Sequence, residues 1–63
     1  MLDTLNGKRK TFVAAILEGN APHQAAIEAG YSERSSYQTA SRLLKEPEIS
    51  QAIRRAFATF ELL

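Results

Sequence analysis

Apolar side chains recur along the chain at intervals of three and four residues, the spacing that places them on one side of an α-helix. The clearest stripe is formed by Ile49, Ala52, Ile53, Ala56, Phe57 and Phe60. An earlier apolar face is formed by Phe12, Val13, Ile16 and Leu17. No stretch shows the sustained alternation, rich in β-branched residues, that is typical of a strand. The pattern predicts an all-α fold, a three- to four-helix bundle.

Helix-ending and helix-starting residues divide the chain into four expected helices. Their ranges are about 6–18, 21–29, 33–45 and 47–61, within a single domain over 1–63. The expected N-caps are Asn6, Asn20 and Ser32. Gly19 and Gly30 are suited to the left-handed position that follows a helix, and Pro47 to the first position of one. Glu46 is a poor cap, so we expect a loose junction before the last helix.

Residues 24–32 read QAAIEAGYS and predict two helices joined by a three-residue turn, Gly30-Tyr31-Ser32. A sharp turn needs a positive φ, which glycine adopts without strain. Ala26, four residues before Gly30, leaves room for the following helix to cross, and Tyr31 would fill the corner. This is the pattern of a helix-turn-helix, whose second helix enters the major groove of DNA. A plain helical hairpin fits the same residues and remains open at this point.

The helix expected over 33–45 has two chemically different sides when its residues are placed at about 100° each. Its inner side holds Ser36, Thr39, Ala40 and Leu43. Its outer side carries no carboxylate and consists of Arg34, Ser35, Gln38, Ser41, Arg42 and Lys45. Since arginine binds guanine and glutamine binds adenine through paired hydrogen bonds, this side is the candidate DNA-reading face. Tyr37 lies between the two sides, and we expect it at the edge of the core, with a phosphate contact as the alternative.

Charge adds further candidate contacts with the DNA backbone. The net charge is only +1, but the segment between positions 5 and 45 contains six basic side chains and only three acidic ones. Lys8, Arg9 and Lys10 at the start of the first helix are suited to phosphates, as are Asn20 and His23 at the start of the second. An ordinary solvated surface is the alternative for each of these groups.

The composition argues against several other classes of protein. There is no cysteine, and the single histidine, His23, has no neighbours suited to a metal site, so we expect no metal and no cofactor. Paired carboxylates with a base and phosphate-binding glycine loops are absent, which argues against an enzyme. The longest apolar run, Phe12–Leu17, is far shorter than the roughly 20 residues that span a bilayer. We therefore expect an intracellular protein without a membrane segment.

Several blocks of the sequence together resemble the N-terminal domain of phage terminase small subunits. The blocks are Phe12-Val13, Gly19-Asn20-Ala21, residues 24–32, Ser41-Arg42-Leu43-Leu44 and Pro47. The resemblance implies a helix-turn-helix domain that recognises the packaging start site on viral DNA in the host cell cytoplasm. It implies a non-catalytic subunit that forms a homo-oligomeric ring and presents double-stranded DNA to a large subunit with ATPase and nuclease activity.

The resemblance covers about residues 5–53, and the sequence departs from the family pattern at a few positions. Asn6-Gly7 stands where the family often has Thr-Pro, and Ser36 where a small apolar residue is usual. Family members are usually much longer, so we interpret the chain as a DNA-binding domain separated from an oligomeric protein. Two other functions remain open, a helix-turn-helix transcriptional regulator and a helical protein-interaction or oligomerisation module. The contact surface of such a module would be Ile27, Phe57, Phe60, Leu62 and Leu63.

Overall fold

The computed structural model describes the backbone of residues 7–62 and the side chains of residues 7–58. The helices are α1 (Gly7–Leu17), α2 (Pro22–Glu28), α3 (Ser36–Lys45) and α4 (Pro47–Leu62), with one 3₁₀ turn, η2 (Glu33–Ser35), before α3. No strand occurs within 7–62, so the predicted all-α fold is confirmed. The expected cap at Asn6 lies outside the described residues.

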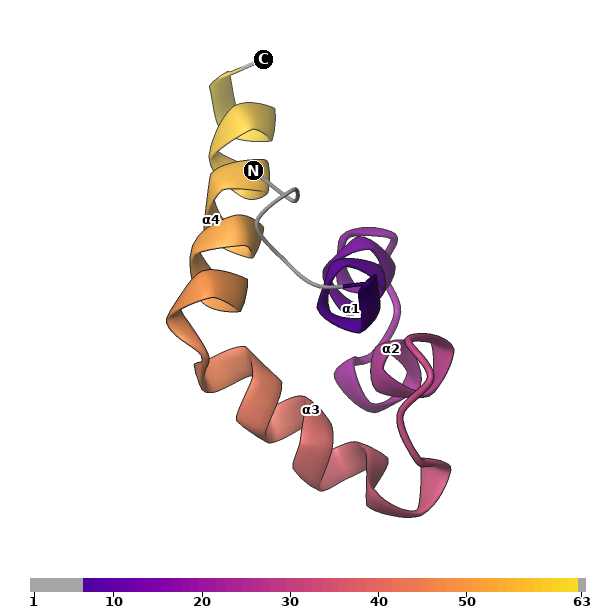
Figure 1. Cartoon of the computed structure of the whole chain (residues 1–63). Helices are drawn as coiled ribbons and strands as arrows, with labels where there is room; N and C mark the ends of the chain where they lie inside the picture. The colour runs from indigo at the N-terminus through magenta and orange to yellow at the C-terminus, as the bar shows by residue number, and fades with distance from the viewer. Residues whose placement is uncertain (1–6, 63) are drawn as a thin grey trace.

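The helices are arranged around α1, which lies in the angle formed by α3 and α4 (Figure 1). α2 lies between α1 and α3, and it packs against both of them. α4 runs on past the other helices, which gives the molecule its long dimension in extents of 38 × 21 × 17 Å. One side of α3 therefore faces the bundle, while the other side is left outward.

α1 and α2 end in the same way, each at a glycine with a positive φ. Gly19 has φ 101° and Gly30 has φ 98°. At the first site, Gly19 N–H donates to the Ile16 carbonyl and Asn20 N–H to the Ala15 carbonyl, at 3.0 and 3.2 Å. This pair of bonds is the Schellman motif, which satisfies carbonyls that the helix itself leaves unpaired.

The second Schellman motif closes α2 and starts the turn towards α3. Gly30 N–H donates to the Ile27 carbonyl and Tyr31 N–H to the Ala26 carbonyl, at 3.0 and 3.1 Å. A Cβ added at Gly30 would meet only the Lys8 side chain, at 3.7 Å, so the turn needs glycine for its backbone angle and not for space. The predicted turn at Gly30 is therefore present.

The expected cap at Asn20 is wrong, and the one at Ser32 has the expected position without a capping hydrogen bond. The N-cap of α2 is Ala21, with extended backbone angles, and no side chain caps that helix. The Asn20 amide instead donates from Nδ2 to the Ala15 carbonyl at 3.0 Å, so it stabilises the end of α1. Ser32 precedes η2 but makes no side-chain cap bond, and the chain winds first into a 3₁₀ turn. The expected α-helix from residue 33 consequently starts at Ser36.

The core is built mainly of small side chains around one aromatic ring. Its buried apolar members are Phe12, Val13, Ala15, Ala25, Ala26, Ala29, Ala40, Leu43 and Ile49. Phe12 and Ile49 are fully buried, and Ala26 is fully buried on α2, which packs against α3. Ser36, where we expected a hydroxyl near the core, is 2% exposed. Among the described residues no buried side-chain nitrogen or oxygen lacks a hydrogen-bond partner, so this buried hydroxyl is accommodated.

Candidate nucleic-acid interface

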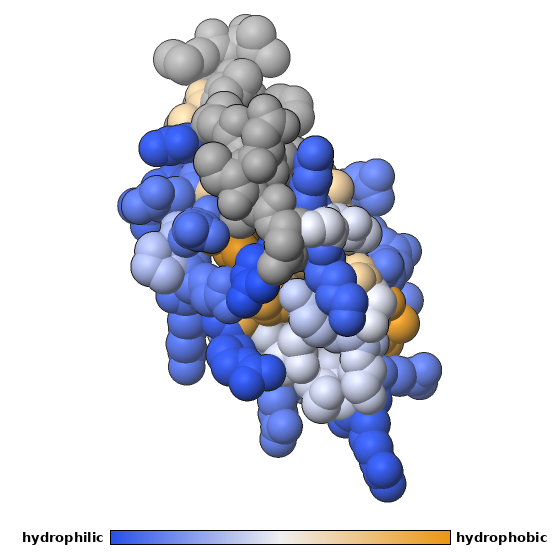
Figure 2. Space-filling view, in the orientation of Figure 1, coloured by the Kyte–Doolittle hydropathy of each residue, from blue (hydrophilic) through white to orange (hydrophobic). Residues whose placement is uncertain are grey.

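The outward side of η2 and α3 carries the predicted DNA-reading residues. Exposed residues on it are Arg34, Gln38, Ser41, Arg42 and Lys45, while Ser35 is half-buried. The inward side holds four buried residues, Ser36, Thr39, Ala40 and Leu43. In the view of Figure 2, hydrophilic side chains cover the lower edge of the molecule, where Figure 1 shows α3. The two sides therefore separate in the structure along the line that the sequence predicted.

The outward side is slightly concave. A shallow hollow on it is lined by Tyr37, Gln38, Ser41, Arg42 and Lys45. Two of its lining residues are cationic, and the other three carry neutral groups that both donate and accept hydrogen bonds. Such a set can bind phosphate oxygens and base edges, and it contains no anion to repel them.

Tyr37 departs from its prediction. It is 71% exposed, so it does not close the edge of the core as expected. Its ring stacks on the ring of His23 from α2, with 4.3 Å between centroids and 13° between planes. The helical wheel placed Tyr37 at the margin but contained no information about a partner on the neighbouring helix.

Arg9 has a partner within the chain. Its Nε and one terminal guanidinium nitrogen donate to the two carboxylate oxygens of Glu46, at 2.7 and 2.9 Å. Both side chains are 32% exposed. The pair connects α1 to the junction between α3 and α4, so the junction that we expected to be loose is held by a two-point contact. This planar pairing is the geometry that arginine makes best with a carboxylate.

The ion pair changes the titration of both groups. The hydrogen bonds from Arg9, and then its charge, lower the pKa of the Glu46 carboxyl, and the charge of Arg42 acts in the same direction. The carboxylate in turn raises the pKa of the Arg9 guanidinium, mainly through the same hydrogen bonds. Arg9, Arg42 and Glu46 line one hollow together with Tyr31, Thr39 and Leu43. Glu46 thus lies near Arg42, one of the DNA-reading candidates, and its carboxylate is engaged by Arg9.

The remaining basic candidates on α1 are placed near the turn. Lys8 is exposed, and its ammonium nitrogen lies 5.2 Å from the centroid of the Tyr31 ring. Cation–π attraction at this distance holds the Lys8 charge over the turn between α2 and α3. Lys10 is also exposed on the same helix. The structure therefore places Lys8 close to the turn. Arg9, which lies between Lys8 and Lys10 in the sequence, contacts Glu46 instead.

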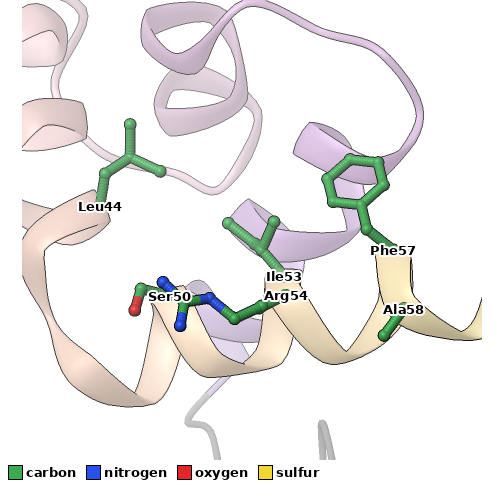
Figure 3. A pocket seen from close by; sticks show the side chains of 6 residues that line it. All are labelled: Leu44, Ser50, Ile53, Arg54, Phe57 and Ala58. Atoms are coloured by element: carbon green, nitrogen blue, oxygen red, sulfur yellow. The ribbon is translucent and has the colours of Figure 1, made fainter.

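A second feature of the surface is apolar and lies on α4. Leu44, Ser50, Ile53, Arg54, Phe57 and Ala58 line a hollow there. Figure 3 shows Leu44, Ile53 and Phe57 pointing to the same side of the chain, with Ser50 and Arg54 along the near side of α4. Phe57, a member of the interaction surface that the sequence left as an alternative, is 49% exposed. Arg54 was not among the predicted site residues, although the Arg54-Arg55 pair in the sequence was a signal that could have drawn attention to it.

Metal and membrane sites were searched for over the described residues. Within them, no group of three or more histidine, cysteine, aspartate or glutamate side chains is placed to hold a metal ion. None of the helices described there combines the length and the apolar character needed to cross a bilayer.

Comparison with known proteins identifies the family. Residues 5–62 match the family described as terminase small subunit. The chain is similar to the PBSX phage terminase small subunit of Bacillus subtilis (strain 168), with 40% identity over 53 residues, which are 84% of this chain. Those residues are 20% of that protein, so the chain spans about a fifth of the length of this relative. No solved structure matches the chain significantly. The chain therefore belongs to the terminase small subunit family.

Proposed function

We propose that the chain is the DNA-binding domain of a phage terminase small subunit and that it recognises viral DNA for genome packaging. The observation that carries the proposal is the outward side of α3 and the turn before it, which exposes Arg34, Gln38, Ser41, Arg42 and Lys45. α3 itself contains no carboxylate, and the single one over residues 33–45 is the exposed Glu33 at the start of η2. α2, the turn at Gly30 and α3 follow one another as in a helix-turn-helix, with α3 as the recognition helix.

The proposal gives different roles to different candidates. Arg34, Gln38 and Arg42 are suited to base edges, because arginine and glutamine make paired hydrogen bonds in the major groove. The smaller polar groups and the remaining exposed cations are suited to the phosphate backbone, and they are Ser35, Ser41, Lys45, Lys8 and Lys10. Arg9 and Asn20 are engaged within the chain, so we assign no DNA contact to them.

The family match supports a wider role in packaging. We propose that the chain acts without a catalytic centre of its own, in the host cell cytoplasm. In the full-length protein it would form a homo-oligomer and work with a large subunit through regions outside this domain. A transcriptional regulator would use the same DNA chemistry on a different target. The match over residues 5–62 to the terminase small subunit family favours the packaging role.

A second candidate function is contact with another copy of the chain. The apolar hollow on α4 favours it, since Phe57 leaves half of its surface in water beside Leu44 and Ile53. Light scattering over a range of concentrations tests this candidate. Self-association that is lost in Phe57→Ser, together with no DNA binding by either protein, would favour this function over DNA recognition.

The DNA-binding proposal is tested by titrating a labelled duplex from a packaging region at several salt concentrations. Low salt is included because a single domain of this type binds weakly alone. Arg42→Ala and Arg34→Ala should each weaken binding by roughly 1–3 kcal/mol where the side chain reads a base. Lys8→Ala should weaken binding to all sequences alike and reduce the slope of log affinity against log salt by about one.

The matched control is Gln51→Ala, which changes an exposed neutral residue on α4 and should leave the affinity as it is in the unaltered chain. Circular dichroism shows whether each variant remains folded. If both arginine variants bind as the unaltered chain does, α3 is not the DNA-contacting helix and the proposal is wrong.

A further inference from the structure

We infer that Tyr37 contacts the DNA backbone and that His23 positions it by stacking. This inference rests on the proposed function, because it adds a residue to the interface formed by α3. It takes up the phosphate contact that the sequence left open for Tyr37 as the alternative to the core edge, and it replaces the expectation that His23 itself lies near a phosphate. The observations that lead to it are the exposure of Tyr37, its ordered stack and its position on the helix.

Tyr37 combines a high exposure with a stacking partner for its ring. Tyr37 is 71% exposed, yet its ring is held 4.3 Å from that of His23 and tilted by only 13°. An exposed aromatic ring normally loses rotational freedom when it binds a partner, and that loss weakens binding. Here α2 and α3 each supply one ring, so much of this ordering is already present in the folded chain.

The position of Tyr37 on α3 favours a contact with the sugar-phosphate backbone of the major groove over a contact with the base edges. At about 100° per residue, Tyr37 lies about 80° from Lys45, which is central on the outward side, and Arg42 lies about 60° away on the other side. When such a helix enters the major groove, its central residues face the bases and its marginal residues face the sugar-phosphate backbone.

The neighbouring surface agrees with this placement. Tyr37 borders the polar hollow that also includes Gln38, Ser41, Arg42 and Lys45. It also borders a second hollow, which is lined by Pro22, His23, Ala40, Ser41 and Leu44. Tyr37 therefore lies where the two hollows adjoin, with His23 on one side of it, and a strand of phosphates along the groove edge would pass there.

The chemistry of the two side chains assigns their roles. A phenol hydroxyl can donate a hydrogen bond to an anionic phosphate oxygen, and such a bond is stronger than one between neutral groups. The contact carries no sequence information, so Tyr37 adds affinity for double-stranded DNA of any sequence. His23 acts through Tyr37 and is a positioning residue, since its ring fixes the direction of the phenol.

The test uses the full 63-residue chain with the packaging-region duplex and an unrelated duplex of the same length. Tyr37→Phe keeps the stack and removes the hydroxyl, and it should weaken binding to both duplexes by about 3- to 10-fold. His23→Ala removes the stack and should give a similar loss on both. His23→Phe keeps an aromatic partner and should restore affinity to within about twofold of the unaltered chain.

A second readout follows the stack directly. The ring protons of Tyr37 should be shifted by the ring current of residue 23 in the unaltered chain and in His23→Phe, and this shift should be lost in His23→Ala. Thermal unfolding of each variant shows that the chain is folded under the binding conditions.

The outcomes separate this inference from the proposed function. Loss of binding in Arg42→Ala with unchanged binding in Tyr37→Phe would leave the DNA-binding role in place and overturn the contact by Tyr37. Unchanged binding in both variants would overturn both. A loss confined to the packaging-region duplex would show a base contact and contradict the backbone role. A failure of His23→Phe to restore affinity would show that the imidazole itself contacts DNA.

Discussion

α3 and α4 each bury one face against the same core, but the side chains that they leave exposed differ in polarity and charge. α3 buries Leu43 and Ala40 and presents polar and cationic groups outward. α4 buries Ile49 completely, while Phe57, two turns further on, is 49% exposed beside an apolar hollow. The two surfaces fit different partners, because an acid-free polar face suits a polyanion and an exposed apolar patch suits another protein surface.

This difference explains why a repeating apolar stripe is an incomplete guide to burial. The stripe on α4 continues in the sequence from Ile49 to Phe60, but among its described side chains exposure rises from 0% at Ile49 to 49% at Phe57. On α3 the apolar stripe is short, and α2 and α4 pack against that helix. How far a helix is buried depends on how far its neighbours reach, and this is a property of the assembled fold.

The largest expected effect comes from the buried end of α4. Ile49→Ala should lower the free energy of unfolding by roughly 2–5 kcal/mol, because it removes a fully buried side chain and leaves a cavity. Urea unfolding followed by circular dichroism measures this. A loss below about 1 kcal/mol would show that α4 is not packed against the core in solution.

The next effect tests the turn that places α3. Gly30→Ala should cost roughly 1–2 kcal/mol, since φ at this position is 98° and a side chain is strained there. The matched control is Gly7→Ala, where a Cβ meets nothing within 4 Å and no positive φ is required. Equal stabilities for the two variants, measured in the same urea series, would contradict the sharp turn between α2 and α3.

A smaller effect is expected at the exposed end of the α4 stripe. Phe57→Ala should cost about 1 kcal/mol or less, because half of that ring is already in water. The comparison with Ile49→Ala is made in the same unfolding series at two protein concentrations. If Phe57→Ala is as damaging as Ile49→Ala and its effect grows with concentration, the ring is buried in an assembly of several copies.

The smallest effect concerns the contact between Arg9 and Glu46. The pKa of Glu46 is lowered from 4.5 by the hydrogen bonds from Arg9, so its contribution to stability is present above pH 4.5. It is lost as the pH falls through the lowered pKa of the folded state. Glu46→Gln should therefore lower Tm slightly at pH 6, and the difference should vanish in strong acid. A difference in Tm that persists unchanged in acid would contradict this linkage.

Local signals in the sequence predicted most of the fold. The four helices lie within about three residues of their predicted bounds, because glycine at 19 and 30 and proline at 47 act on the backbone next to them. The cap at Asn20 was predicted wrongly, since a side chain that can cap a helix can equally bond to the helix before it. Ser32 stands at the N-cap position of η2 but makes no capping hydrogen bond with its side chain.

The candidate site was predictable only in part. The periodicity of residues 33–45 alone predicts which of them are buried and which are exposed. The exposure of Arg34, Gln38 and Arg42 agrees with the helical wheel of that segment. The contact of Arg9 with Glu46 joins residues 37 positions apart, and the stack of Tyr37 on His23 joins two helices. Both depend on how the helices cross, and no short-range pattern in the sequence contains that information.

The most direct test of the account is a chemical-shift titration of the ¹⁵N-labelled chain with packaging-region DNA. The account predicts that the amide signals of residues 34–45 move most, with smaller changes near Lys8 and Lys10 at the start of α1. It predicts that signals from residues 50–58 of α4 remain in place. Shifts concentrated on α4, with α3 unaffected at saturating DNA, would contradict the claim that α3 is the DNA-contacting helix.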